Sequence, residues 1–221
     1  MSDPSPLLDR AGIEDAFRRL GERLARRGVI ADLYVFGGAA MALAYDSRRA
    51  TRDVDALFKP HGIVHDEALA VAAELGLPRW WLNEQASSYV APGGDPAASR
   101  VFDHPGLRVF AASPAHLLAM KAFAARPRDA EDIRQLSRVL DLHSADEVFT
   151  LVREIFPEQE PPERLRLLLE DIFTGKDDQD IGRALGSHPQ RGASWHGHDL
   201  EVMTCGTLVR VRQRNRSAFG K

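Results

Sequence analysis

Residues 30–58 contain the pattern that most restricts how this chain can fold. A short run rich in β-branched and aromatic residues, 30–36, is interrupted by Gly37 and Gly38, and the small residues of 39–45 then favour a helix. Residues 53–58 alternate between two faces and end before a proline, which is typical of a strand. Strand, glycine turn, helix and strand in this order predict an α/β fold.

The sequence before and after this pattern supplies further elements of both kinds. Apolar residues recur at helical spacing in 8–27, and 64–75 also favours a helix. Between residues 77 and 112 the pattern is irregular, with short strands expected at 80–82 and 108–111. A small mixed sheet is therefore expected in the first half of the chain.

The second half of the chain is predicted to be helical. Ser113 and Pro114 are typical of a helix start, and Ser144 with Glu147 forms a capping box. The expected helices are 113–125, 129–140, 144–155 and 161–173. We therefore expect an α/β (α+β) architecture, with a sheet domain at 1–112, a helical domain at 113–176, and a tail at 177–221 whose packing on the core stays open.

Composition excludes several classes of protein. The chain has 221 residues, of which 44% are apolar and 28% charged, so it should fold rather than remain disordered. Its net charge of -3 argues against a broad basic face that coats nucleic acid. A single cysteine, Cys205, permits neither an internal disulfide nor a zinc cluster. No signal peptide or membrane span is evident, so a cytoplasmic protein without a membrane partner is expected.

Asp53 and Asp55 are the candidate metal ligands. Residues two apart on a strand point the same way, with backbones roughly 6 to 7 Å apart, so both carboxylates should share one face. Like charges at that distance repel and favour a cation between them. Mg²⁺, or Mn²⁺ in its place, accepts one or two carboxylates plus phosphate oxygens, which indicates phosphoryl or nucleotidyl transfer. The alternative is a strand with a solvated polar face.

Gly37 and Gly38 add a possible phosphate contact to this pair. Without side chains, their backbone allows a phosphate to approach closely, although a double glycine is often only a turn. The stretch Phe36-Gly37-Gly38, a helix, and then Thr51-Arg52-Asp53-Val54-Asp55 resembles the signature of the DNA polymerase β superfamily of nucleotidyltransferases. That superfamily commonly adds a third carboxylate from a neighbouring strand as general base, and Asp103 is our candidate for it.

A second segment narrows the resemblance. Leu118-Ala119-Met120-Lys121, followed by Arg126-Pro127-Arg128-Asp129 and Asp132, is similar to the MenT/AbiEii group of bacterial toxin nucleotidyltransferases. Together the two segments cover roughly residues 30 to 140. By this resemblance Lys121 binds the triphosphate of the incoming nucleotide. Independently, its helical neighbours are apolar, so it needs a partner or must extend to solvent at the helix edge.

The remaining candidates surround these groups in the sequence. Asp129 and Asp132 lie one helical turn apart and are expected near the site. Asp132 or water would take the proton of the hydroxyl that accepts the nucleotide. The alternative is that the helix dipole alone favours acids in the first turn of a helix. The group has a hydroxyl residue at the Thr51 position that some cognate antitoxins phosphorylate, so the resemblance implies a regulatory site there; the alternative is an ordinary β-forming or turn residue before a strand. Candidate phosphate-binding arginines are Arg48, Arg49, Arg52, Arg126 and Arg128. Trp80 and Trp81 are expected in a core or interface rather than in the site.

The resemblance implies a specific activity. A toxin of this group would use an NTP to add pyrimidine nucleotides to the 3′ acceptor end of tRNA, would block translation, and would have a cognate antitoxin protein. Two alternatives stay open: nucleotidyl transfer to a small molecule or a protein hydroxyl, and a degenerate nucleotidyltransferase fold that only binds a partner.

Overall fold

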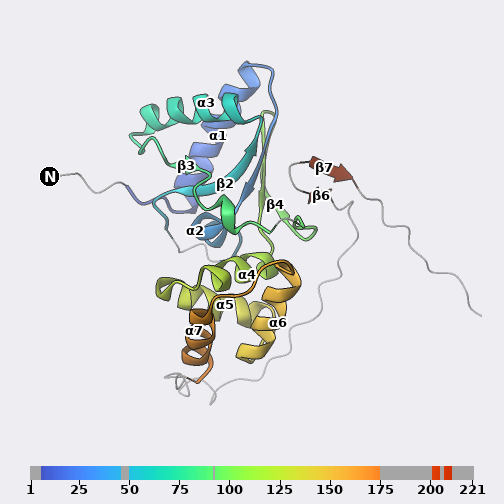
Figure 1. Cartoon of the computed structure of the whole chain (residues 1–221). Coiled ribbons are helices and arrows are strands. Elements are labelled where there is room, and N and C mark those ends of the chain that lie inside the picture. The colour runs from blue at the N-terminus through green and yellow to red at the C-terminus, as the bar shows by residue number, and fades with distance from the viewer. Residues whose placement is uncertain (1–5, 46–49, 92, 175–200, 205–206, 211–221) are drawn as a thin grey trace, which may run out of the picture.

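The structure is a computed structural model that describes residues 6–45, 50–91 and 93–174, together with the backbone of residues 201–204 and 207–210. A five-stranded mixed sheet forms its centre (Figure 1). Its strands are β1 (Ala31–Val35), β2 (Val54–Lys59), β3 (Leu82–Asn83), β4 (Ser99–His104) and β5 (Leu107–Ala111).

The order of the strands puts β1 in the middle and the short β3 at an edge. The order is β3-β2-β1-β5-β4, in which β1 runs antiparallel to β2 and parallel to β5. β3 pairs parallel to β2, and β4 pairs antiparallel to β5. Four of the five residues of β1 are buried, as expected for a strand covered on both faces.

Two helices cover one face of the sheet. These are α1 (Arg10–Arg26) and α3 (His61–Leu75), which lie together above the sheet in Figure 1. The helix α1 begins where Asp9 accepts a hydrogen bond from the Gly12 N–H at 2.8 Å, and it buries an apolar stripe that includes Phe17. Trp81 fills the space between these elements, and its indole N–H donates to the Ala68 carbonyl at 2.8 Å.

The other helices lie on the opposite side of the sheet, below it in Figure 1. The short α2 (Gly37–Ala40) continues into a π-helical turn, η1 (Met41–Tyr45). Two further short turns are η2 (Ser87–Tyr89) and η3 (Pro127–Asp129). The helices that follow are α4 (Pro114–Ala124), α5 (Ala130–Val139), α6 (Ala145–Ile155) and α7 (Glu163–Thr174).

The buried carboxylate of Asp95 joins the sheet to α4. It accepts hydrogen bonds from the Tyr34 hydroxyl of β1 at 2.9 Å and from the backbone N–H of Ser113 at 2.7 Å. Ser113 is the N-cap of α4, and Tyr34 has a raised pKa because it is buried and faces this acid. A buried, fully bonded carboxylate therefore sets where α4 begins relative to β1.

These observations confirm the predicted mixed α/β fold class. They differ from the sequence prediction in the irregular stretch, where β4 was not anticipated and the strand expected at 80–82 lies at Leu82–Asn83. In the predicted tail, β6 (Glu201–Thr204) and β7 (Thr207–Arg210) pair antiparallel. The division into domains stays a prediction. Within the described residues, none of the helices is both long and apolar enough to cross a membrane.

We predict that Gly106→Ala destabilises the fold. A Cβ at Gly106 would approach the Gly21 carbonyl oxygen and lie 2.6 Å from the Ala25 nitrogen, both of them backbone atoms of α1. Such overpacking costs about 1–3 kcal/mol, which lowers Tm by about 2–4 °C per kcal/mol in a chain of this size. Gly62→Ala is the control, because nothing lies within 4 Å of its added Cβ. Equal melting temperatures for the two variants would show that the turn between β4 and β5, which contains Gly106, does not pack this closely on α1.

Candidate active site

The strand β2 presents opposite chemistry on its two faces. Val54, Ala56 and Phe58 are buried on the face toward α1 and α3. Asp55 points to the other face, and Asp53, just before the strand, joins it in the lining of one cleft of about 420 Å³. The structure thus places both acids at the same cleft, as their spacing predicts.

The glycine pair lies against these acids. The N–H of Phe36 donates to the Asp55 carbonyl at 3.0 Å, which brings the turn after β1 next to β2. Gly37 has a φ of +65°, and a Cβ there would lie 3.1 Å from Asp55 Oδ2. A Cβ on Gly38 would lie 2.9 Å from Thr51 Oγ1. Both positions need glycine for close packing, and both line the cleft.

Lys121 lies across the cleft in α4 with only 8% of its surface exposed. Its ammonium contacts Asp129 Oδ1 at 2.9 Å and Asp132 Oδ2 at 2.7 Å. A buried lysine is tolerated only with such partners, so the alternative of an ammonium that extends to solvent is wrong. Asp129 makes no side-chain capping bond at the start of α5, and Asp132 is itself buried. Their positions are thus better explained by Lys121 than by the helix dipole.

The acidity of Asp55 is perturbed by its surroundings. Burial, followed by the nearby charge of Asp53, raises its pKa to about 6. Arg126, the backbone N–H of Ala86 and Lys121 act in the opposite direction. The Arg126 guanidinium also lies 5.3 Å from the centre of the Tyr89 ring, and both residues line the cleft. The protein therefore compensates the two acids incompletely.

Asn83 is a site residue that the sequence did not reveal. It lies on β3, directly opposite Asp55 in the strand register. Its side-chain N–H donates to Asp53 Oδ2 at 3.0 Å and to the Trp80 carbonyl at 3.1 Å. The sequence signal for it is weak, because one asparagine after two tryptophans does not indicate that a two-residue strand pairs with β2.

Asp103 is not at the site, so our candidate for a third carboxylate is wrong. It lies on the edge strand β4, separated from β2 by β5 and β1, and pairs with Arg100 at 2.9 Å. The strand next to β2 instead carries Asn83, an amide where a third carboxylate was expected. The remaining candidates lie at the cleft, where Thr51 donates to the Asp53 carbonyl at 3.0 Å and Arg52 and Arg128 are exposed in the lining. Arg48, Arg49 and Cys205 lie outside the described residues.

The donor set suits a magnesium ion shared with a substrate. Among the residues that the structure describes, no group of three or more histidine, cysteine or acidic side chains could enclose a metal by itself. Asp53 and Asp55 at an open cleft leave room for phosphate oxygens and water, the other ligands that Mg²⁺ prefers. Burial and then the charge of Asp53 raise the pKa of Asp55 despite the nearby Arg126 and Lys121, so a cation shared by the two acids would stabilise their charged forms.

The acidity of Asp55 predicts an unusual effect on stability without metal. Its carboxyl has an ordinary pKa of 3.8 when unfolded and about 6 when folded, so the folded state binds more protons between these values. Stability should therefore fall as pH rises through this window and then stay level. Asp55→Asn, which lacks the charge, should melt at a higher temperature than the wild type at neutral pH in EDTA.

The same measurement at low pH provides the check. Below pH 3.8 both folded and unfolded wild type are protonated at Asp55, so the advantage of Asp55→Asn should disappear. Asp103→Asn, at an exposed acid, controls for the general loss of a negative charge. An Asp55→Asn variant that is less stable than the wild type at neutral pH would contradict this account.

Comparison with known proteins identifies the family to which this chain belongs. A family profile described as "Nucleotidyltransferase of unknown function (DUF6036)" matches residues 14–174, which include every described cleft residue named above. No curated protein and no solved structure matches the chain. Because the profile spans well over half of the sequence, this chain belongs to that family of nucleotidyltransferases.

Proposed function

We propose that the protein transfers a nucleoside monophosphate from an NTP to an acceptor hydroxyl and releases pyrophosphate. The observation that carries this proposal is one cleft that brings together the glycine pair, Asp53, Asp55 and Lys121 from segments far apart in the sequence. In the reaction, an acceptor oxygen forms a bond to the α-phosphorus while the bond to the β-phosphate oxygen breaks. Family membership supports nucleotidyl transfer in general.

The two acids and the lysine have separate roles in this proposal. Asp53 and Asp55 hold Mg²⁺, or Mn²⁺ in its place, which neutralises charge on the phosphates. Lys121 faces the same cleft as a compact cation and contacts the triphosphate. Asp129 and Asp132 hold its ammonium in place. Since Asp132 is buried against Lys121, the acceptor's proton passes to water in the open cleft.

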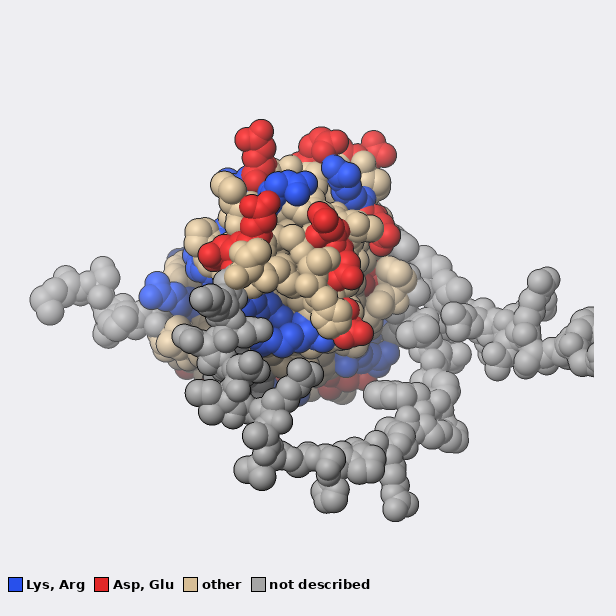
Figure 2. Space-filling view, turned by 90° about the horizontal axis from the view of Figure 1, so that it is seen from below, with Lys and Arg blue, Asp and Glu red and all other residues tan. Residues whose placement is uncertain are grey.

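The resemblance of Lys121 and of residues 126–132 to the MenT/AbiEii toxins makes the 3′ end of tRNA the acceptor that we propose, with pyrimidine nucleotides as donors. Contacts with RNA phosphates would be local, through Arg52, Arg126 and Arg128 at the cleft. The face in Figure 2 carries many acidic side chains, with some Lys and Arg among them, over its upper part, and a band of Lys and Arg lower down, rather than a uniform basic surface. A local contact fits this distribution.

A cognate antitoxin would act on the same site through Thr51. Its hydroxyl is half-buried between Gly38 and the Asp53 carbonyl, so a phosphate there would add negative charge beside the acids and repel nucleotide. Mass spectrometry after co-expression with the product of a neighbouring gene tests this idea. Unmodified Thr51 together with full inhibition would refute it.

We predict that the wild type, given Mg²⁺, total RNA and each α-labelled NTP in turn, labels RNA. Asp53→Asn and Asp55→Asn should each lower the rate by about a thousandfold or more, because loss of a metal ligand removes several kcal/mol of transition-state stabilisation. Asp103→Asn is the matched control and should keep the wild-type rate.

The other outcomes separate the alternatives. Label in protein or in a small molecule, with none in RNA, would replace the acceptor and keep the reaction. Calorimetry that detects no Mg²⁺-dependent NTP binding would leave only a partner-binding module with a nucleotidyltransferase fold.

The position of Asn83 leads to a second prediction. Asn83→Asp would place a third carboxylate next to Asp53 Oδ2, at the position of the present amide. The added repulsion should lower Tm in EDTA, and the extra negative charge should enlarge the rise in Tm that Mg²⁺ produces. Asn83→Ala, which adds no charge, should show no larger rise than the wild type. Equal rises for Asn83→Asp and Asn83→Ala would show that Asn83 lies outside the metal's reach.

A further inference from the structure

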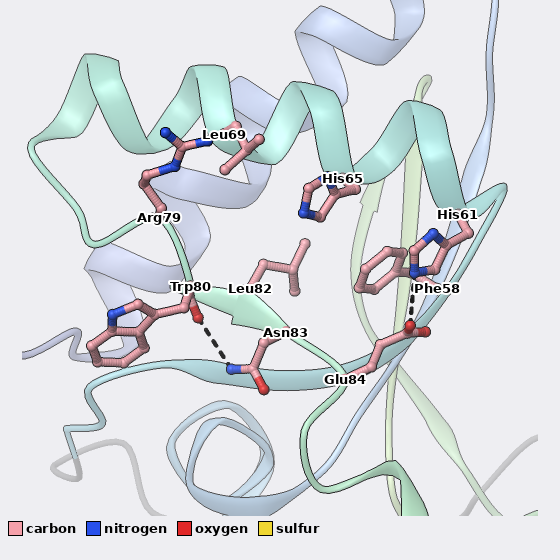
Figure 3. Close-up of a pocket in the computed structure, with 9 residues that line it drawn as sticks. All are labelled: Phe58, His61, His65, Leu69, Arg79, Trp80, Leu82, Asn83 and Glu84. Atoms are coloured by element: carbon pink, nitrogen blue, oxygen red, sulfur yellow. Dashed lines mark hydrogen bonds and ion pairs between the residues drawn. The ribbon is translucent and has the colours of Figure 1, made fainter.

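A second hollow opens at the edge of the sheet, beside β3. Its volume is about 430 Å³, and it lies between the start of α3 and the segment that leads into β3. Figure 3 shows Leu82 in its middle, with Trp80 on one side and Phe58 and His61 on the other. Nothing in the proposed reaction uses these side chains.

Flat rings form the walls of this hollow. The rings of Phe58 and His61 are stacked at 5.1 Å with an angle of 18° between their planes. His65, one turn further along α3, continues the stack at 6.3 Å and 5°. Trp80 is 44% exposed, whereas the adjacent Trp81 is fully buried. The prediction that both tryptophans lie in a core or interface thus holds for Trp81, while Trp80 presents its indole to solvent.

Polar groups of two kinds accompany the rings. The exposed guanidinium of Arg79 lines the hollow, and the Glu84 carboxylate lies there 2.8 Å from His61 Nε2. A metal ligand set is not formed, because the described residues contain no cluster of three or more acidic, histidine or cysteine side chains suited to a cation. Flat faces, one cation and one acceptor of hydrogen bonds instead suit a planar heteroaromatic ring that carries a phosphate and amino groups.

The hollow is connected to the active site through Asn83. This residue lines the hollow and donates to Asp53 Oδ2 at 3.0 Å. It lies on the edge strand, opposite Asp55, and neighbouring strands are about 4.8 Å apart. A chain that ends at the two acids therefore reaches the hollow by passing around one short strand.

We propose that this hollow binds a nucleobase of a single-stranded polynucleotide acceptor, one or a few nucleotides from the reacting hydroxyl. The base stacks on Trp80 and the histidine rings, Arg79 contacts the adjoining phosphate, and Glu84 accepts from an exocyclic amino group. The inference rests on the proposed nucleotidyl transfer, and it assigns the acceptor a binding site separate from that of the NTP.

The test measures the two ligands separately. Fluorescence anisotropy with a short, fluorescein-labelled single-stranded oligoadenylate gives the acceptor affinity, and calorimetry with Mg²⁺ and an NTP gives the donor affinity. Trp80→Ala should weaken oligoadenylate binding about tenfold, because stacking of a base on an aromatic ring is lost. Arg79→Ala should also weaken it and reduce its salt dependence. Neither change should alter NTP binding, since neither residue lines the cleft that contains Asp53, Asp55 and Lys121.

Matched variants and distinct outcomes make the result decisive. Trp80→Phe should retain most of the affinity, and Leu167→Ala, at an exposed apolar residue of α7, should retain all of it. Equal oligoadenylate affinity in Trp80→Ala and the wild type, with NTP binding intact, would overturn this inference alone. Absence of Mg²⁺-dependent NTP binding in the wild type would instead overturn the proposed function.

Discussion

Repulsion between the carboxylates of Asp53 and Asp55 is the constraint around which this site is built. Burial and then the neighbouring charge of Asp53 raise the pKa of Asp55 to about 6, so the surrounding groups do not fully compensate the cost of two half-buried acids. The surrounding groups reduce this cost without removing it. Asn83 donates to Asp53, the backbone N–H of Ala86 donates to Asp55, and Arg126 and Lys121 add positive charge. The negative charge of Asp53 and Asp55 that these groups do not compensate favours a divalent cation.

The arrangement of the two halves of the chain follows from the same electrostatics. Lys121 belongs to α4, yet it has to lie opposite β2 with its charge already balanced by Asp129 and Asp132. Asp95 fixes the start of α4 against β1 through Tyr34 and Ser113, which positions the helix that carries Lys121 relative to the sheet. The two carboxylates in contact with the ammonium also hold it at the wall of the cleft, because a buried charge is stable only with such partners.

The sequence predicted the features that depend on local spacing. Asp53 and Asp55 share a cleft because strand periodicity spans only two residues, and Gly37 and Gly38 lie beside them because they directly follow β1, which pairs with β2. Asp103 was wrongly chosen as a third carboxylate, and Asn83 was missed, because their positions depend on contacts between distant segments and not on local spacing. Which strand lies next to β2 is decided by pairing between distant segments, and β3 is only two residues long. A strand that short has no periodicity from which it could be recognised.

The brevity of β3 also affects how a substrate can reach the acids. A long, regular edge strand would separate the two faces of the sheet and expose a row of backbone groups to other chains. Here the edge strand is two residues long, and Trp80 and Glu84, which line the hollow, lie shortly before and directly after it. The strand that is too short to predict therefore carries Asn83, the residue that contacts Asp53 and also lines the hollow. A flexible acceptor of the kind that we propose would pass around this short edge to contact both faces of the sheet.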